Sequence, residues 1–231
     1  MSKLLLSSVD TQVIEYLQQR NKLLFSEKID KLLSYEQNHT DMQCLIVDDT
    51  AYVLSECNHL IDNLKKDYRT VKIKEKIQIS YPNNILLNCL VINNCLIGKI
   101  DYIAKEVVEN CNIKNFKLIN VNQGYTKCST CVVNNNSIIT EDESISNVLQ
   151  KNNFDVLKIK KGFVHLEGAE YGFIGGASGL ISKDTLFFTG DITKHPDYEK
   201  INKFCLDRNI KISYIENKTL EDIGGIILLK N

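Results

Sequence analysis

The chain has 231 residues and a formal net charge of −1, with 28 Lys and Arg against 29 Asp and Glu. With no excess of basic residues, the chain is not expected to present the basic surface that nucleic-acid binding requires, so we expect no nucleic-acid partner. No apolar run approaches the ~20 residues of a membrane span, and the short apolar stretch near Met1 predicts no signal peptide. We therefore expect the eight cysteines to be reduced thiols in a cytoplasmic protein that does not enter membranes.

The first 42 residues differ in pattern from the rest of the chain. Leu4–Leu6 predicts a short strand, and Thr11–Tyr35 has the apolar spacing of a long helix. At the other end, Ile223–Leu229 predicts one more strand. Together these segments could supply a fifth, split unit that closes a ring formed by the residues between them.

Four stretches between these ends look like copies of one another. In each, two branched apolar residues follow the first position, Asp or Asn falls five places on, and Thr, Cys or Ser comes next. The copies are 45, 42 and 48 residues apart, a period that is typical of repeat architectures. They begin at Cys44, Cys89, Cys131 and Gly179.

Each copy predicts a hairpin, because Asp and Asn tolerate the left-handed backbone of a tight turn between two apolar runs. A helical pattern and a short strand then follow, so the unit reads strand, strand, helix, strand. The predicted helices are Asp101–Asn112, Glu143–Asn152 and Asp197–Arg208. The predicted closing strands are Arg69–Ile73, Phe116–Asn120, Asp155–Ile159 and Ile210–Ile215.

These elements predict an α/β fold, a pseudo-symmetric ring (an α/β propeller) of strand-strand-helix-strand repeats. We expect a single domain over 1–231, with 1–42 as an N-terminal helical segment that closes the ring and 43–231 as the repeat units. Closure would remove open sheet edges. The alternative is an open α/β sandwich with merely similar hairpins.

Three histidines have a carboxylate two places on, which puts both side chains on one face of a strand. Such a pair can transfer protons to and from one substrate. For His195–Asp197, the position of Pro and Asp at a helix start favours a capping role. For His39–Asp41, the polar surroundings predict a surface loop. The second pair follows an apolar strand and is the best catalytic candidate of the three, but a structural or solvent-facing role for its histidine is the favoured interpretation. The pairs are His39–Asp41, His165–Glu167 and His195–Asp197.

A glycine-rich stretch covers residues 167–179 and holds five glycines and two carboxylates. Such a stretch allows the backbone to approach a ligand closely. The alternative is that these glycines serve packing at the narrow end of a ring. It contains no phosphate-binding motif, so we expect no nucleotide cofactor and no other cofactor.

Cys128 and Cys131 form a lone Cys-x-x-Cys motif in a strand pattern. A zinc ribbon would need a second pair at suitable spacing, so we expect no metal site here. Cys131 occupies the start of a repeat and is predicted to be buried, which leaves Cys128 as the candidate for an exposed thiol.

A ring of five such units resembles the pentein fold, the fold of amidinotransferases, arginine and agmatine deiminases and dimethylarginine hydrolases. The stretches "GFIGG" (172–176) and "LEDIGGIILL" (220–229) resemble a small, functionally uncharacterised branch of that fold. Catalytic members use a His-x-acid element, a carboxylate that grips the guanidinium, and a cysteine nucleophile after a glycine pair near the C-terminus. Here His165-Leu-Glu167 matches the first element and Gly224-Gly225 matches the glycine pair.

The chain departs from the pattern where the nucleophile should stand. The tail reads Ile226-Ile227-Leu228-Leu229, without histidine or cysteine, and leucine cannot attack carbon. The resemblance therefore implies a small branch that lacks the C-terminal catalytic cysteine.

Two hypotheses follow. In the first, the protein binds a small ligand without covalent chemistry, and acidic residues near the ring axis hold a guanidino or other cationic group. The candidate ligand-binding residues are Glu170, Asp191 and Asp222, together with Glu167.

In the second hypothesis, the protein is a hydrolase or amidinotransferase with a relocated nucleophile. Cys128 would attack, His165 would act as the base and Glu167 would orient it. Adjacent units place equivalent residues around the ring, so we expect the Cys128 sulfur not to contact His165, which favours binding over catalysis. A metal site built from His165 and His195 would lack compact ligand spacing.

Overall fold

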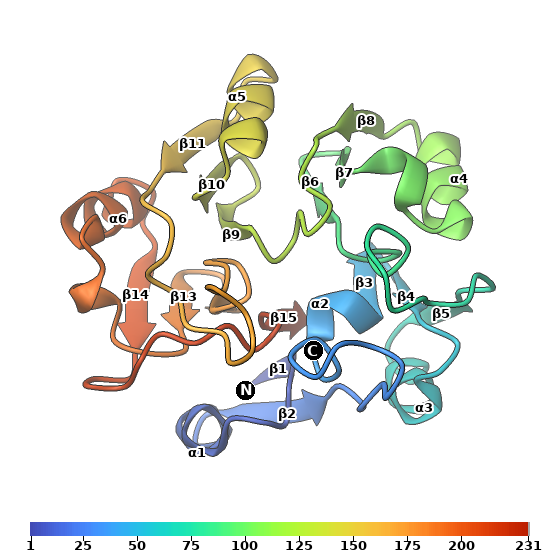
Figure 1. Ribbon diagram of the computed structural model, residues 1–231, viewed down its shortest axis with the longest axis horizontal. Coiled ribbons are helices and arrows are strands. Elements are labelled where there is room, and N and C mark those ends of the chain that lie inside the picture. Colours follow the sequence, from blue (N-terminus) through green and yellow to red (C-terminus); the bar gives the residue numbers. More distant parts are fainter. Residues whose placement is uncertain (231) are drawn as a thin grey trace.

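Five three-stranded sheets surround a common centre in the computed structural model, which describes residues 1–230 (Figure 1). In every sheet the middle strand pairs antiparallel with one neighbour and parallel with the other. A helix connects the two parallel strands, as a parallel pair requires. The predicted α/β ring of strand-strand-helix-strand units is therefore confirmed.

Four of the sheets follow the chain in order. The first is β3 (Cys44–Val47), β4 (Thr50–Val53), α3 (Asn58–Leu64) and β5 (Arg69–Lys72). The second is β6 (Leu90–Ile92), β7 (Cys95–Gly98), η1 (Ile100–Tyr102), α4 (Lys105–Ile113) and β8 (Lys117–Asn120). The third is β9 (Thr130–Asn134), β10 (Ser137–Thr140), α5 (Glu143–Lys151) and β11 (Asp155–Lys158). The fourth is β12 (Ser178–Ser182), β13 (Thr185–Phe188), η2 (Ile192–Lys194), α6 (Tyr198–Leu206) and β14 (Lys211–Tyr214).

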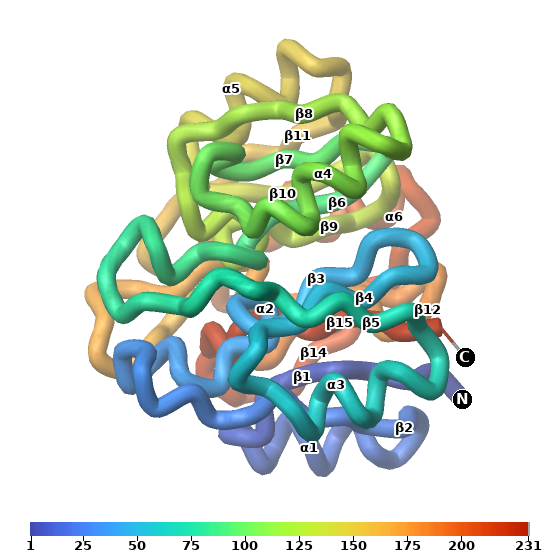
Figure 2. The backbone as a smooth tube through the Cα atoms, turned by 90° about the vertical axis from the view of Figure 1, so that its right-hand side faces the viewer, coloured from blue at the N-terminus to red at the C-terminus, as the bar shows by residue number. Residues whose placement is uncertain are grey.

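The fifth sheet joins the two ends of the chain. Strand β15 (Ile227–Leu229) pairs antiparallel with β1 (Ser2–Leu6), and β1 pairs parallel with β2 (Asn21–Phe25) across α1 (Thr11–Gln18). Strands β1 and β15, from opposite ends of the described chain, consequently lie near each other in both views (Figures 1 and 2). The split unit that the sequence predicts is present.

The predicted long helix over Thr11–Tyr35 is wrong. Helix α1 ends at Gln18, and the apolar residues that follow it belong to β2, where Leu23 and Leu24 pair with Leu4 and Leu5 of β1. Sheet pairing across the chain outweighs the local helical spacing of these leucines.

Asparagine supplies most of the left-handed turns of the structure. Asn93 and Asn94 have positive φ in the hairpin between β6 and β7. Asn115, Asn153 and Asn209 have φ values of 57°, 64° and 58° just beyond the ends of α4, α5 and α6. Since asparagine enters this region at lower cost than other residues with a side chain, the same residue type ends three successive helices.

The four repeat starts are buried in the first strand of each sheet or next to it. Cys44, Cys131 and Gly179 lie in β3, β9 and β12, and Cys89 directly precedes β6. Strand β12 also lies beside β9 and β15, so the fourth sheet meets the third and the fifth through these strands.

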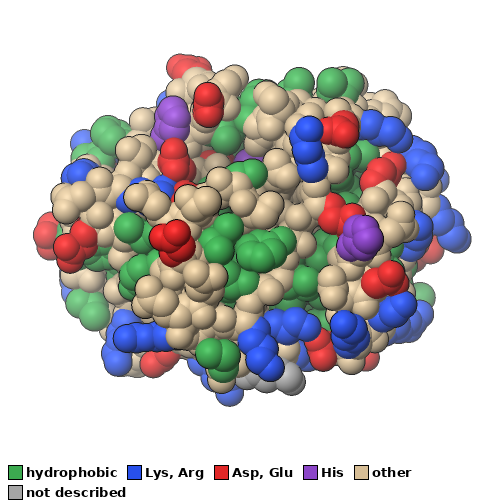
Figure 3. All heavy atoms as spheres, turned by 90° about the horizontal axis from the view of Figure 1, so that it is seen from below, with side chains coloured by type: hydrophobic (Ala, Val, Ile, Leu, Met, Phe, Trp, Pro, Cys, Tyr) green, Lys and Arg blue, Asp and Glu red, His purple; other side chains and the backbone are tan. Residues whose placement is uncertain are grey.

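The surface carries both signs of charge. Lys and Arg lie among Asp and Glu around the rim of the face in Figure 3, with hydrophobic side chains towards its middle. Among the helices of residues 1–230, none is long and apolar enough to cross a membrane.

Candidate functional site

A cavity of about 170 Å³ lies among the inner loops of the sheets. Its walls come from the segment before α2 (Thr40–Gln43), the turn before β9, the glycine-rich stretch and the segment before β15. Two carboxylates, Glu36 and Asp222, line it together with His39 and Cys128. Its aromatic walls are Tyr35, Tyr125, Tyr171 and Phe173.

A single helical turn, α2, brings His39 and Asp41 to the centre. The backbone N–H of Asp41 donates to the carbonyl oxygen of Gly224 at 3.1 Å. Gly224 has a φ of 81°, and a Cβ there would overlap the backbone of His39. A glycine is therefore required where the two segments touch.

The prediction that His39 lies in a surface loop is wrong. His39 is 5% exposed and Asp41 is 1% exposed. The polar sequence around them concealed this burial, since the packing depends on Gly224, far along the chain.

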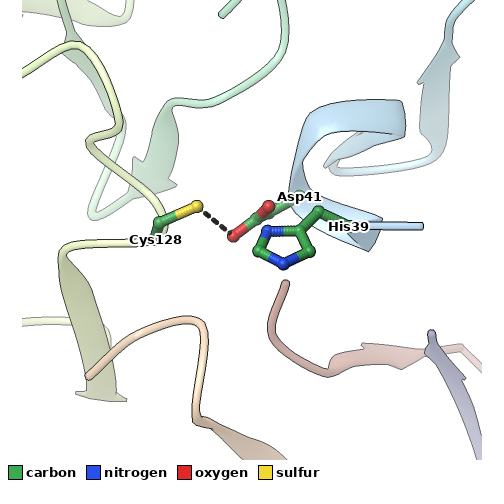
Figure 4. Close-up of side chains that lie close together, drawn as sticks. All are labelled: His39, Asp41 and Cys128. Atoms are coloured by element: carbon green, nitrogen blue, oxygen red, sulfur yellow. Dashed lines mark hydrogen bonds between the residues drawn. The ribbon is translucent and has the colours of Figure 1, made fainter. Parts of the chain in front are cut away.

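Cys128 faces Asp41 across the centre (Figure 4). Its thiol donates to the Asp41 Oδ2 atom at 2.8 Å, and the side-chain amide of Asn88 donates to the sulfur at 3.0 Å. The Asn88 Oδ1 atom accepts from the backbone N–H groups of Lys127 and Cys128, which fixes the turn that carries the thiol.

The predictions of an exposed Cys128 and of its place in a strand are both wrong. Cys128 is 3% exposed and lies in the turn before β9, whereas Cys131 lies in β9 and is buried as expected. Burial raises the pKa of the Cys128 thiol well above its usual range, and the carboxylates of Asp41 and Asp222 raise it further. The thiol is therefore the protonated partner in its contact with Asp41.

The deep burial of Asp41 affects both the pKa of its carboxyl and its hydrogen bonding. Burial raises the pKa of its carboxyl to about 6, while the nearby His39 and Lys127 lower that pKa in part. Its Oδ1 atom is buried and has no hydrogen-bond partner within residues 1–230. An open acceptor in such a place is unusual and costs free energy unless a ligand or water satisfies it.

Asp222 is held by two backbone N–H groups. Its Oδ2 atom accepts from the N–H of Phe173 at 2.9 Å, and its Oδ1 atom accepts from the N–H of Gly224 at 2.9 Å. His39 Nε2 lies 3.8 Å from Oδ1. A Cβ on Gly176 would overlap this carboxylate, so the glycine-rich stretch makes room for Asp222.

Glu36 is the second carboxylate that lines the cavity. Its Oε1 atom accepts from the Tyr125 hydroxyl at 2.7 Å, and its Oε2 atom accepts from the Asn84 amide at 3.1 Å. In the described part of the chain, no lysine or arginine forms an ion pair with Glu36 or Asp222.

The predicted catalytic set is divided between two places. Cys128 lines the central cavity, whereas His165 and Glu167 are exposed and line a neighbouring hollow of about 790 Å³, to which His39 and Asp222 also contribute. Neither hydrogen bond of the Cys128 sulfur goes to His165. The structure brings Cys128 to a different His-x-acid pair, His39 and Asp41.

The other predicted residues also fall in different places. Of the predicted ligand-binding residues, Asp222 lines the cavity, Glu170 is exposed, and Asp191 caps η2 by accepting from the N–H and hydroxyl of Thr193. His195 and Asp197 bond to each other and to the backbone of Lys160, which is a structural role.

The comparisons with solved structures agree with this architecture. A mutant of DDAH from Pseudomonas aeruginosa complexed with citrulline is 9% identical, with a TM-score of 0.61 over 98% of each chain. Agmatine deiminase from C. jejuni is 12% identical, with a TM-score of 0.56 over 98% of this chain and 92% of that one. An amidinotransferase from Microseira wollei is 8% identical, with a TM-score of 0.54 over 94% and 88%.

Such identities show the fold alone. All three structures are pentein-fold proteins, so the resemblance noted in the sequence is confirmed. No curated protein matches the chain. The model of a family of unknown function (DUF6873) matches residues 5–227. The protein therefore has the pentein fold and belongs to the DUF6873 family.

Proposed function

We propose that the central cavity binds the cationic head of a small molecule, a guanidinium or a similar group, without forming a covalent bond to it. The observation that carries the proposal is the pair of carboxylates, Glu36 and Asp222, that line the cavity without a lysine or arginine partner among the described residues. Hydrogen bonds from the protein offset part of the cost of burying these acids, and a positive charge in the cavity would offset more of it.

The aromatic walls support a cation as the ligand. Tyr125 stacks on Phe173 with ring centroids 6.3 Å apart, and Tyr171 meets the edge of Phe173 at 6.0 Å. Faces of such rings attract a planar guanidinium as well as a compact ammonium. The cavity of about 170 Å³ exceeds the ~10–15 Å³ that one water needs, so it has room for a head group of several atoms.

The names of the structural neighbours point to the same chemistry. They include an agmatine deiminase, an amidinotransferase and a DDAH complexed with citrulline. Agmatine is a guanidino compound, so a guanidino ligand is the first to test here. Fold alone does not carry an activity over to this chain.

The absence of a nucleophile in the tail favours binding over covalent chemistry. Residues 226–229 are Ile and Leu, and the one cysteine that lines the cavity, Cys128, has a thiol pKa well above its usual range. A thiol that stays protonated is a poor nucleophile.

The second candidate function is hydrolysis or amidino transfer with Cys128 as nucleophile. It is favoured by the contact of Cys128, which lines the cavity, with Asp41, close to His39. A cation bound beside Asp222 would offset one of the negative charges that raise the thiol pKa.

We also place the protein in a reducing compartment such as the cytoplasm. All eight cysteines are free and buried, as expected of thiols that are never oxidised to disulfides.

Isothermal titration calorimetry with agmatine and with arginine tests the proposal. We expect binding to the wild type and at least tenfold weaker binding to Glu36→Gln and Asp222→Asn. Glu170→Gln, which removes an exposed acid, serves as the matched control and should bind like the wild type. The absence of binding by the wild type would overturn the proposal, and steady release of ammonia or urea that Cys128→Ala abolishes would favour the second candidate.

A further inference from the structure

We infer that His39, Asp41 and Cys128 form a binding site for a transition-metal dication of the zinc type. An imidazole nitrogen, a carboxylate oxygen and a thiol sulfur from these residues lie within 4.8 Å of one another. Ligand atoms around one tetrahedral Zn²⁺ are roughly 3.5 Å apart, given bond lengths of about 2.0–2.3 Å. The Cys128 sulfur and the Asp41 Oδ2 atom are already closer than this, at 2.8 Å, so they would separate slightly on binding an ion. The His39 nitrogen would need to approach by about 1.3 Å at most.

The geometry gives the site two sides. His39 and Asp41 come from the segment that begins α2, and Cys128 comes from the facing turn before β9 (Figure 4). In the close-up one ring nitrogen of His39 lies beside the Asp41 carboxylate. The other nitrogen, Nε2, is 3.8 Å from Asp222 Oδ1. Asp222 is therefore close enough that a shift of about 1 Å would let it accept from this nitrogen, the arrangement that orients metal-binding histidines.

A second observation points to a ligand at this place. The Asp41 Oδ1 atom is buried without a partner among the described residues, in a side chain that is 1% exposed. A metal ion would use the open coordination capacity of this carboxylate, which no protein donor fills.

The donor set decides the class of ion. A thiolate and an imidazole bind Zn²⁺ and similar soft or borderline ions, whereas Mg²⁺ and Ca²⁺ prefer oxygen ligands alone. His39 and Cys128 also line the central cavity, so a fourth position would face that cavity and take a water or a ligand atom.

Binding of the metal ion replaces the proton of the Cys128 thiol and needs no oxidant or reductant. The Cys128 thiol loses its proton to solvent and forms a sulfur–metal bond, in place of its hydrogen bond to Asp41. The Asp41 carboxylate and the neutral His39 ring each donate a lone pair. The thiolate and the carboxylate together neutralise the dication.

This site does not depend on the binding of a guanidino compound, and it differs from the sequence-based expectation of no metal. Asp41 and Cys128 are 87 residues apart, so no ligand spacing in the sequence reveals it. A metal ion here would add positive charge beside Asp222, and it should weaken the binding of a cationic ligand in the same cavity.

Titration of the chelator-treated protein with Co²⁺ tests the inference. We expect one equivalent to bind, with the near-ultraviolet charge-transfer absorption of a cobalt–thiolate bond, and Zn²⁺ but not Mg²⁺ to displace it. Cys128→Ala should abolish this absorption, and His39→Ala and Asp41→Asn should weaken binding at least tenfold.

The matched control is Cys89→Ala, because Cys89 lines a separate apolar cavity. It should bind Co²⁺ like the wild type. A wild-type protein without the absorption would overturn the inference, as would an absorption that survives in folded Cys128→Ala. If a variant fails to fold, proton release by the wild type gives an independent measurement. We expect one proton to be released for each Zn²⁺ bound. Zn²⁺ binding without proton release would also contradict the site.

Discussion

The Cys128 thiol donates a 2.8 Å hydrogen bond to the Oδ2 atom of Asp41, which lies 87 residues earlier in the chain. The contact joins the segment that begins α2 to the turn before β9, and it places a protonated thiol beside a buried carboxylate. A protonated thiol favours non-covalent binding, loss of the proton would give a nucleophilic thiolate, and replacement of the proton by a metal ion would give a metal site.

Cys128 should react slowly with thiol reagents. Because burial and two nearby carboxylates raise the pKa of its thiol, little thiolate is present at pH 7.5. Asp41→Asn removes one of these carboxylates, so labelling of Cys128 by iodoacetamide should become faster, as peptide mass spectrometry would measure.

Cys205 provides the control for this labelling. It is buried in α6, as the sequence predicts, and burial raises the pKa of its thiol to about 12. Cys205 should stay unlabelled in the folded protein and in Asp41→Asn. Rapid labelling of wild-type Cys128 at neutral pH would show that the electrostatic account of the thiol is wrong.

Gly176→Ala should damage the site and the fold together. A Cβ at this position would overlap the Asp222 carboxylate, which must then move. Overpacking of this kind costs about 1–3 kcal/mol, and the free energy of unfolding in urea should fall by that amount. Agmatine binding should be lost as well.

Gly162→Ala is the control for Gly176→Ala, because it adds the same methyl group where there is no neighbouring atom to overlap. Gly162 has a φ of 89° and nothing within 4 Å of the added Cβ, so the substitution should cost only the ~1–2 kcal/mol of a left-handed residue. Ligand binding should be unchanged. Equal losses of binding in both variants would contradict the proposed role of Gly176.

Glu141 should make stability depend on pH. Burial raises the pKa of its carboxyl to about 8 in the folded protein, from an ordinary value of 4.5, although the Ile174 N–H donates to it. The folded state therefore binds more protons than the unfolded state between these values, and stability should fall as pH rises from about 4.5 to 8.

The variant Glu141→Gln removes this titration. Its free energy of unfolding, measured in urea from pH 5 to pH 9, should decline less with rising pH than that of the wild type. Parallel curves for the two proteins would show that Glu141 is not responsible.

Asn153 tests the turn that ends α5. Its φ of 64° favours asparagine or glycine, so Asn153→Ala should lower the free energy of unfolding by about 1–2 kcal/mol. Asn153→Gly is the matched control and should be close to neutral, since glycine adopts this backbone readily. An alanine variant as stable as the glycine variant would mean that the turn does not require this conformation.

The sheets could be predicted because their signals are local. The Asp and Asn turns between apolar runs specify each hairpin, and the apolar spacing of 143–152 and 197–208 specifies α5 and α6. The helix expected over Thr11–Tyr35 failed because Leu23 and Leu24 pair with β1, a contact that local spacing does not record.

The site could be predicted only in part, since it depends on contacts between distant segments. Asp222 could be found because it is an acidic residue two places before the glycine pair Gly224-Gly225, directly before the last predicted strand. His39 and Asp41 could not, because their burial depends on contact with Gly224. The same His-x-acid pattern at His165 predicted a catalytic pair, but His165 and Glu167 are exposed and line the neighbouring hollow.

A crystal structure of the protein with agmatine tests the central claim most directly. The account predicts the guanidinium in the central cavity, within hydrogen-bond distance of Glu36 and Asp222, against the rings of Tyr125 and Phe173, and with no bond to the Cys128 sulfur. A guanidinium outside the cavity, or a covalent bond between the ligand carbon and Cys128, would contradict it.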